Sequence, residues 1–391
     1  MKNRAHFSFL FVVLTAFGVG CSDDGVKVAD PSSNNQTTGF TNNQTTGSTN
    51  NQTTGQTNGS TAGVACAAEE AALREGLDSA TTDTDFALLL RCAAGGEFVH
   101  SVGDSSASKT YESASTSKWV TAVTILRLVD KGVLNLSDNP QKYLSFWTSD
   151  AASPLSKITL GQLLSFTSGL EVDAPCTSLP GRPFEACVEI IYNNNLASPV
   201  EPGTGFFYTN THLQVAGLMA IKASGKASWG EVFEGFQAET GLFPNGIYDL
   251  PSEQNPRLAG GMHWRGDEYL DFLEAFYSGE LLSESLQRQV LQDHTVGVEI
   301  RKSPALENIG QDWHYGFGFW LECASATYDC SGISRVSSPG AYGAYPYIDY
   351  TTSCVGMLAR QGDLASYPEG KKLLDSVQPQ IDAWTACTSG M

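Results

Sequence analysis

Residues 111–144, YESASTSKWVTAVTILRLVDKGVLNLSDNPQKYL, contain the pattern from which both fold and chemistry can be inferred. Apolar residues recur at helical spacing after Ser115, and Gly132 follows as a typical helix stop. Ser115 and Lys118 are three residues apart at the start of this helix, so their side chains share one face. A poorly solvated lysine has a lowered pKa and can act as a base. The segment therefore predicts a nucleophile and a proton acceptor on one turn.

A second candidate segment is EPGTGFFYTN, residues 201–210, which precedes another predicted helix. It contains Tyr208 and Asn210. A tyrosinate near a cation can accept a proton, and an asparagine amide can orient a substrate carbonyl. Each of the two segments is a weak signal alone, and their combination is what points to a catalytic site.

The order of predicted elements indicates an α+β fold. Besides the helix after Ser115, helices are expected at Ala67–Leu77, Leu160–Phe166, Thr211–Ala223, Leu270–Tyr277 and Ser283–Gln292. Strands are expected at Phe86–Arg91, Phe98–Val102, Phe317–Leu321, Ala344–Ile348 and Cys354–Ala359, with Gly95-Gly96 as a hairpin turn. The strands lie near both ends of the folded part, so we expect one antiparallel sheet built from both chain ends, flanked by helices, with a mostly helical insertion.

These segments resemble the serine β-lactamase-like family, which includes class C β-lactamases, D-alanyl-D-alanine carboxypeptidases and family VIII esterases. The resemblance covers roughly Phe86 to Arg360 and implies a β-lactamase/transpeptidase-like fold. It is carried in order by residues 111–144, by ITLGQLLSFTSGL (158–170), by EPGTGFFYTN (201–210) and by YGFGFW (315–320). The second block has Phe166 where the family usually has histidine.

The third family motif is altered in this chain. Ser338-Pro339-Gly340 lies where the family has Lys-Thr-Gly or His-x-Gly. The resemblance implies that the missing cation would hold a substrate carboxylate, and a neutral serine supplies no such attraction. Arg335 lies three residues upstream, but the sequence does not fix its direction. Gly340 still permits close approach of a substrate.

The resemblance also implies a role for each residue. Ser115 would attack an acyl carbonyl, and Lys118 and Tyr208 would share the proton transfers. Asn210 would position the lysine and the substrate. The N–H groups of Ser115 and Ala341 would form the oxyanion hole, which is worth a few kcal/mol of barrier. Ser338 and Gly340 would line the substrate site, and water would then release the acyl group.

The N-terminus predicts export. Residues 1–20 have the features of a signal peptide, with Lys2 and Arg4 before an apolar stretch too short to span a bilayer. Cys21 follows Gly20, as in a bacterial lipobox, so we expect lipidation and anchoring to a membrane facing the periplasm or cell surface; plain secretion is the alternative. Residues 21–65 include three NNQTTG repeats and predict a flexible tether, and 66–391 form the hydrolase domain.

Nine cysteines fit this compartment. If Cys21 carries lipid, eight remain for disulfides in an oxidising environment. Short loops favour Cys176–Cys187 and Cys323–Cys330. The sequence does not fix the pairing of the remaining four cysteines, for which we take Cys66–Cys92 and Cys354–Cys387 as the working hypothesis. No Cys-x-x-Cys or His-x-x-x-His pair occurs, so a zinc site is disfavoured and no metal is expected.

The composition excludes some functions. A net charge of −19 argues against nucleic-acid binding. The family resemblance and the predicted export signal together imply an extracytoplasmic serine hydrolase acting through an acyl-enzyme, esterase-like on small esters or amides because the third motif lacks its cation. A β-lactamase or D-alanyl-D-alanine carboxypeptidase, and a non-catalytic binding protein that keeps the fold, are the alternatives. We expect no cofactor, a small ester, amide or peptide as substrate, contact with the membrane through the lipid anchor only, and a monomer.

Overall fold

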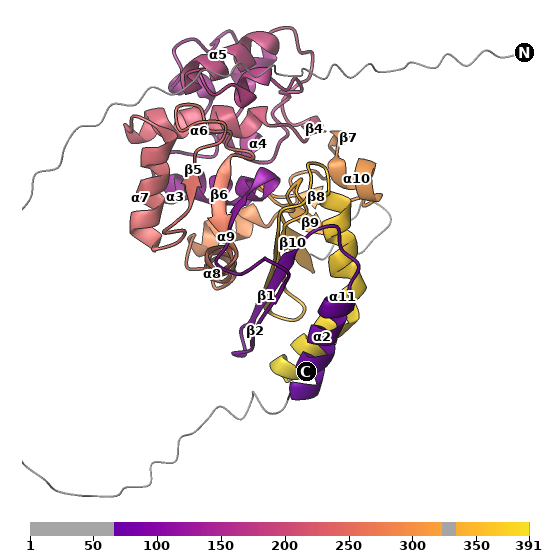
Figure 1. Ribbon diagram of the computed structural model, residues 1–391. Helices are drawn as coiled ribbons and strands as arrows, with labels where there is room; N and C mark the ends of the chain where they lie inside the picture. Colours follow the sequence, from indigo (N-terminus) through magenta and orange to yellow (C-terminus); the bar gives the residue numbers. More distant parts are fainter. Residues whose placement is uncertain (1–65, 323–333, 391) are drawn as a thin grey trace, which may run out of the picture. The chain divides into compact units, whose positions relative to one another are not determined.

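A seven-stranded antiparallel sheet joins the two ends of the domain (Figure 1). The computed structural model describes residues 66–322 and 334–390. The strands, in spatial order, are β2 (Glu97–Val102), β1 (Phe86–Cys92), β12 (Cys354–Arg360), β11 (Tyr345–Asp349), β10 (Arg335–Ser337), β9 (Trp320–Glu322) and β8 (His314–Tyr315). The first strand thus pairs with the last, which confirms the predicted α+β sheet built from both chain ends.

Helices cover both faces of this sheet (Figure 1). On one side, α2 (Ala67–Ser79) packs against α11 (Tyr367–Ser389), a 23-residue C-terminal helix absent from the sequence prediction. On the other side, α8 (Gly266–Tyr277) packs against β1, β11 and β12. Its apolar residues recur at helical spacing, which buries one stripe against the sheet. No helix in the described ranges is long and apolar enough to cross a membrane.

The predicted insertion is mostly helical and surrounds one buried helix. This helix is α3 (Ser117–Asp130), buried from Ser117 to Leu126 and in contact with α6 and α7. The other helices are α4 (Leu160–Leu164), α5 (Phe184–Asn194), α6 (Thr211–Ser224), α7 (Trp229–Thr240), α9 (Glu284–Val290) and α10 (Pro304–Ile309). Single 3-10 turns are Ala114–Thr116, Pro140–Lys142, Pro154–Lys157 and Pro175–Ser178.

The described residues also form two small sheets. One has the order β3 (Thr110–Glu112), β6 (Met262–Arg265) and β5 (Ile247–Tyr248). The other pairs β4 (Gly205–Phe207) in parallel with β7 (Glu299–Lys302). The N–H of Ser113 donates to the Met262 carbonyl, so the first small sheet fixes the chain just before α3.

The expected strand at 317–321 is wrong in its first half. A tight turn separates β8 from β9, with the Gly316 N–H donating to the Phe319 carbonyl at 3.0 Å. Gly318 has φ +82°, and a Cβ there would lie 2.7 Å from the Lys118 carbonyl oxygen. Only glycine fits this position, which brings the turn directly against α3.

The disulfides agree with only part of the sequence prediction. Cys176–Cys187 is confirmed. Pairing of Cys66 with Cys92 and of Cys354 with Cys387 is wrong, because the bonds are Cys66–Cys387 and Cys92–Cys354. Cys92 and Cys354 are partners in the β1–β12 register, and Cys66–Cys387 links the neighbouring helices α2 and α11. The predictions for Cys21, residues 1–65 and Cys323–Cys330 lie outside the described residues.

Candidate active site

Ser115 lies in a sharp turn at the entry to α3. It belongs to the 3-10 turn Ala114–Thr116 that leads directly into the helix. Ala114, just before it, has φ +42°, in the left-handed region that alanine rarely adopts. Backbone strain of this kind persists only where the surroundings hold it, and it clusters at functional sites. The turn places Ser115 in the wall of a cavity.

Lys118 is buried beside the Ser115 hydroxyl. Its Nζ donates to Ser115 Oγ at 2.9 Å and to the Ala259 carbonyl at 2.7 Å, with 2% of the residue exposed. Burial lowers the pKa of Lys118 to about 7; the nearby Asp173 carboxylate raises it and the Arg257 guanidinium lowers it further. A lysine with a pKa near neutrality has an accessible free-amine form, as a general base requires.

Tyr208 completes this group from the other side. The Lys118 Nζ lies 4.7 Å from the centre of the Tyr208 ring, and Trp320 stacks on that ring at 5.1 Å. Burial raises the pKa of Tyr208, although contacts with Ser115 and Trp320 oppose this. The phenol therefore stays protonated, and the tyrosinate considered from the sequence is disfavoured. Lys118 is the better base, and Tyr208 can pass on a proton.

Asn210 lies nearby but does not hold the lysine. Within the described residues the hydrogen bonds of Lys118 go to Ser115 and Ala259, so the expected contact with Asn210 is absent here. The Asn210 N–H instead donates to Asp173 Oδ1 at 2.8 Å, at the start of α6. The second polar partner of Lys118 is the Ala259 carbonyl, which lies far from it in the sequence.

Asp173 and Lys302 were missed by sequence reasoning. Lys302 Nζ lies 3.3 Å from Asp173 Oδ2, and the Lys302 carbonyl accepts from the Tyr208 N–H at 3.0 Å. Together with the Asn210 N–H bond, these contacts tie the segment 208–210 to the end of β7. Neither residue belongs to a motif, so nothing in the sequence could have indicated them.

The altered third motif packs against the turn that bears Ser115. Ser338 is buried, and its Oγ donates to the Ser115 carbonyl at 3.2 Å. A Cβ at Gly340 would lie 2.6 Å from the Ser113 carbonyl oxygen, so glycine permits this close approach. Gly340 and Ala341 line the same cavity as Ser115, and Ser338 is not among its lining residues. Ser338 therefore supports the turn rather than facing a substrate.

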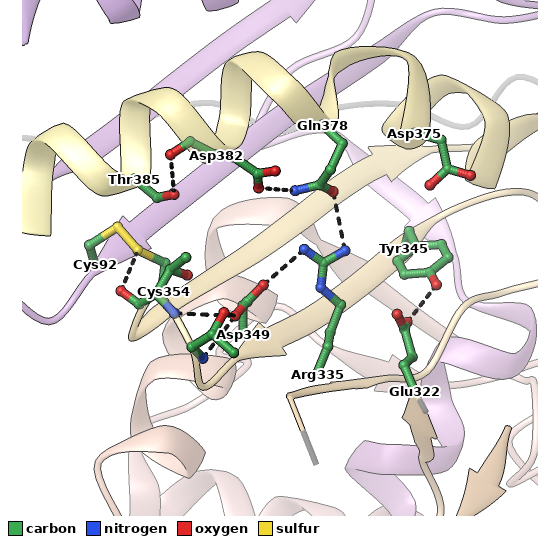
Figure 2. A network of polar contacts seen from close by, with 12 residues as sticks. Cys92, Glu322, Arg335, Tyr345, Asp349, Cys354, Asp375, Gln378, Asp382 and Thr385 are labelled. Carbon is green, nitrogen blue, oxygen red and sulfur yellow. Dashed lines mark hydrogen bonds and ion pairs between the residues drawn. A yellow bond between two sulfur atoms is a disulfide. The ribbon is translucent and has the colours of Figure 1, made fainter. Parts of the chain in front are cut away.

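Arg335 does not replace the missing cation. Figure 2 shows its guanidinium held between the sheet and α11, where it donates to Asp349 at 3.0 Å and to Gln378 at 3.2 Å. It also lies 4.6 Å from the centre of the Tyr347 ring. These three contacts fix Arg335 away from the cavity, whose lining does not include it.

Phe166 is part of the aromatic support behind Tyr208. Its ring stacks on His212 at 4.9 Å and lies 5.6 Å from the Tyr208 ring. His212 is fully buried between Ser168 and the Phe207 carbonyl, and burial lowers its pKa to about 4. His212 is therefore neutral, and its ring can pack against the apolar ring of Phe166. With phenylalanine in place of the family's histidine, Phe166 still packs beside Tyr208.

The cavity beside Ser115 has a volume of about 240 Å³. Most of its wall is apolar or backbone, with Lys302, Glu307 and Asn308 at its polar side. Lys302 is the only cation among the described residues that line it, and it pairs with Asp173. Within the described residues no cluster of three or more His, Cys, Asp or Glu side chains could hold a metal ion.

Comparison with known proteins identifies the family of the chain. The Beta-lactamase family model matches residues 93–364, so the chain belongs to the Beta-lactamase family of serine hydrolases. A 120-residue segment is 31% identical to Penicillin-binding protein 4* of Bacillus subtilis (strain 168), over 29% of this chain. That match spans a quarter of the length of the relative.

Solved structures show the same fold. A putative beta-lactamase from Bacteroides dorei DSM 17855 has a TM-score of 0.66 at 24% identity, covering 81% of this chain and 99% of its own. EstCE1, a hydrolase with promiscuous acyltransferase activity, has a TM-score of 0.63 at 17% identity, covering 81% of this chain and 100% of its own. At these identities the likeness supports the β-lactamase/transpeptidase-like fold.

Proposed function

We propose that the protein is a serine hydrolase that forms an acyl-enzyme on Ser115. The observation that carries the proposal is the 2.9 Å contact between Ser115 Oγ and the buried Lys118 Nζ. The neutral amine of Lys118 takes the hydroxyl proton as Ser115 attacks the carbonyl carbon. The backbone N–H groups of Ser115 and Ala341 receive the developing oxyanion.

The proton then returns to the leaving group. Tyr208 lines the cavity and its ring lies beside Lys118 Nζ, so its phenol gives a proton to the departing oxygen or nitrogen and regains one from Lys118. Water attacks the acyl-enzyme by the same route in reverse, which releases the acid and restores Ser115. Water is the only co-reactant that the two steps consume.

The preferred substrate is a neutral small ester or amide. Ser338 is turned toward the Ser115 carbonyl, and Arg335 is bound to Asp349 and Gln378. The cation that lines the cavity, Lys302, already has Asp173 as its partner. A substrate carboxylate would therefore have to displace an existing ion pair. A net charge of −19 further disfavours anionic substrates.

Two measurements test the proposal. A fluorescent fluorophosphonate should label the wild type and fail to label Ser115→Ala. In addition, kcat/KM should be higher for p-nitrophenyl butyrate than for nitrocefin, which bears a carboxylate. The absence of any label would refute the acyl-enzyme, and a strong preference for nitrocefin would refute the esterase preference alone.

We also propose that the protein is exported and anchored by lipid at Cys21. Support comes from the signal-like residues 1–20 and the small residue before Cys21. Mass spectrometry of the mature N-terminus should find an acylated residue 21. Cys21→Ser should move the protein to the soluble fraction, and a lipid-free terminus at another residue would contradict the anchor.

A further inference from the structure

A short turn between β12 and α11 brings an exposed leucine to the reaction cavity. Leu364 is 74% exposed and lines the same cavity as Ser115. A single exposed leucine usually needs no explanation. Here its position is informative, because the cavity it lines is the one into which a substrate must enter.

The turn is anchored rather than loose. The Gly362 N–H donates to the Tyr342 carbonyl at 2.9 Å, and the Ser366 N–H donates to the Asp363 carbonyl at 3.0 Å. Ala365 has φ +77°, a conformation that costs energy for alanine and persists only where neighbours impose it. The structure thus presents Leu364 at a defined place on the cavity rim.

The remaining wall near the nucleophile supplies more apolar surface. Pro304 and Ala305 come from the start of α10, and Trp320 comes from β9. Charged groups at the other side have partners, since Lys302 pairs with Asp173 and Glu307 Oε1 accepts from the Ser303 N–H. A ligand therefore gains more from apolar contact here than from a new ion pair.

We propose that Leu364 is a specificity-determining residue that binds an alkyl chain of a neutral ester substrate. This inference rests on the proposed hydrolase function and names the substrate class for the same cavity. The volume of about 240 Å³ exceeds the roughly 150 Å³ that accommodates benzene in an engineered cavity. A chain of about four to six carbon atoms therefore fits. Such a chain belongs to either the acyl or the alcohol part of the ester.

Two ester series distinguish these parts. One varies the acyl chain as p-nitrophenyl acetate, butyrate and hexanoate. The other varies the alcohol as methyl, butyl and hexyl acetate, with acid release followed by titration. Wild-type kcat/KM should rise by about threefold per added methylene in the series whose chain reaches Leu364, and stay flat in the other.

Variants of Leu364 test the residue itself. Leu364→Ser should lower kcat/KM by about tenfold for the ester with the six-carbon chain in the series that depends on Leu364, with the shortest ester of that series unchanged within twofold. Leu364→Met should retain the chain-length dependence. Leu196→Ser is the matched control, because Leu196 is 54% exposed and does not line the cavity.

The outcomes separate this inference from the function on which it rests. Equal slopes for wild type and Leu364→Ser in both series would overturn the role of Leu364 while leaving the hydrolase intact. An equal loss on all esters would also overturn it, because that result indicates a structural effect. A wild type that hydrolyses no ester and takes no fluorophosphonate label would overturn the proposed function, and this inference with it.

Discussion

The start of α3 and the segment after β10 pack directly against each other beside the cavity, and they differ in how far they keep the family pattern. At the start of α3, Ser115 and Lys118 are in contact, and the lysine is desolvated as a base requires. At the end of β10, Ser338 replaces the family's cation and turns inward to the Ser115 carbonyl. The two regions thus differ: Ser115 and Lys118, which we propose to react, lie in contact, whereas the residue expected to bind a substrate carboxylate has changed.

The largest effect should come from removing the nucleophile. Ser115→Ala should lower kcat by at least about 10³-fold, because no acyl-enzyme can form. It should leave the thermal midpoint nearly unchanged, since one partly buried hydroxyl is lost. Ser137→Ala, an exposed serine outside the cavity, should behave as wild type. An adduct located by mass spectrometry on another serine would contradict the assignment.

The second-largest effect should come from the proposed proton-transfer pair, Lys118 and Tyr208. Lys118→Ala and Tyr208→Phe should each slow acylation by about 10²-fold or more, the scale for losing a positioned acid or base. Combined, they should cost less than the product of the two factors, because residues that act as a unit are not additive. Single-turnover kinetics with p-nitrophenyl butyrate measures this. Independent, fully multiplicative effects would mean that the two residues serve separate steps.

The start of α3 was also the region most predictable from sequence. Helical periodicity and the three-residue spacing of Ser115 and Lys118 are local properties, and the structure retains both. Partners far away in sequence were not predictable. Ala259 lies 141 residues from Lys118, and no local pattern connects them. Asp173 likewise reaches the site through the fold, from a segment with no regular periodicity.

The sheet shows the same contrast between local patterns, which can be predicted from the sequence, and long-range contacts, which cannot. Pairing of both chain ends followed from the order of strands, but the disulfides required the register of β1 with β12 and the packing of α2 on α11. Loop length alone predicted Cys176–Cys187, because its cysteines are 11 residues apart. The direction of the Arg335 side chain could not be predicted from the sequence either, because its partners Asp349 and Gln378 come from β11 and α11.

A smaller effect is expected at the end of β10. Ser338→Ala removes the hydrogen bond to the Ser115 carbonyl, worth about 1 kcal/mol. We expect about a fivefold lower kcat/KM on neutral and carboxylate-bearing esters alike, because Ser338 supports the turn and does not contact the substrate. Ser156→Ala removes a similar hydrogen bond far from the cavity and should leave kcat/KM unchanged. A loss confined to carboxylate-bearing substrates would show that Ser338 recognises the carboxylate.

The smallest effect tests the charges around Lys118. Its neutral form is the base, so kcat/KM should rise with pH through the lysine pKa of about 7. Asp173 raises that pKa and Arg257 lowers it. Asp173→Asn should therefore shift the acidic limb of the pH profile to lower pH, and Arg257→Gln should shift it to higher pH. Glu201→Gln breaks only the exposed ion pair with Lys157 and should leave the limb in place. Shifts of the same sign in Asp173→Asn and Arg257→Gln would mean that the substitutions disturb packing, whereas opposite signs require a charge effect on the base.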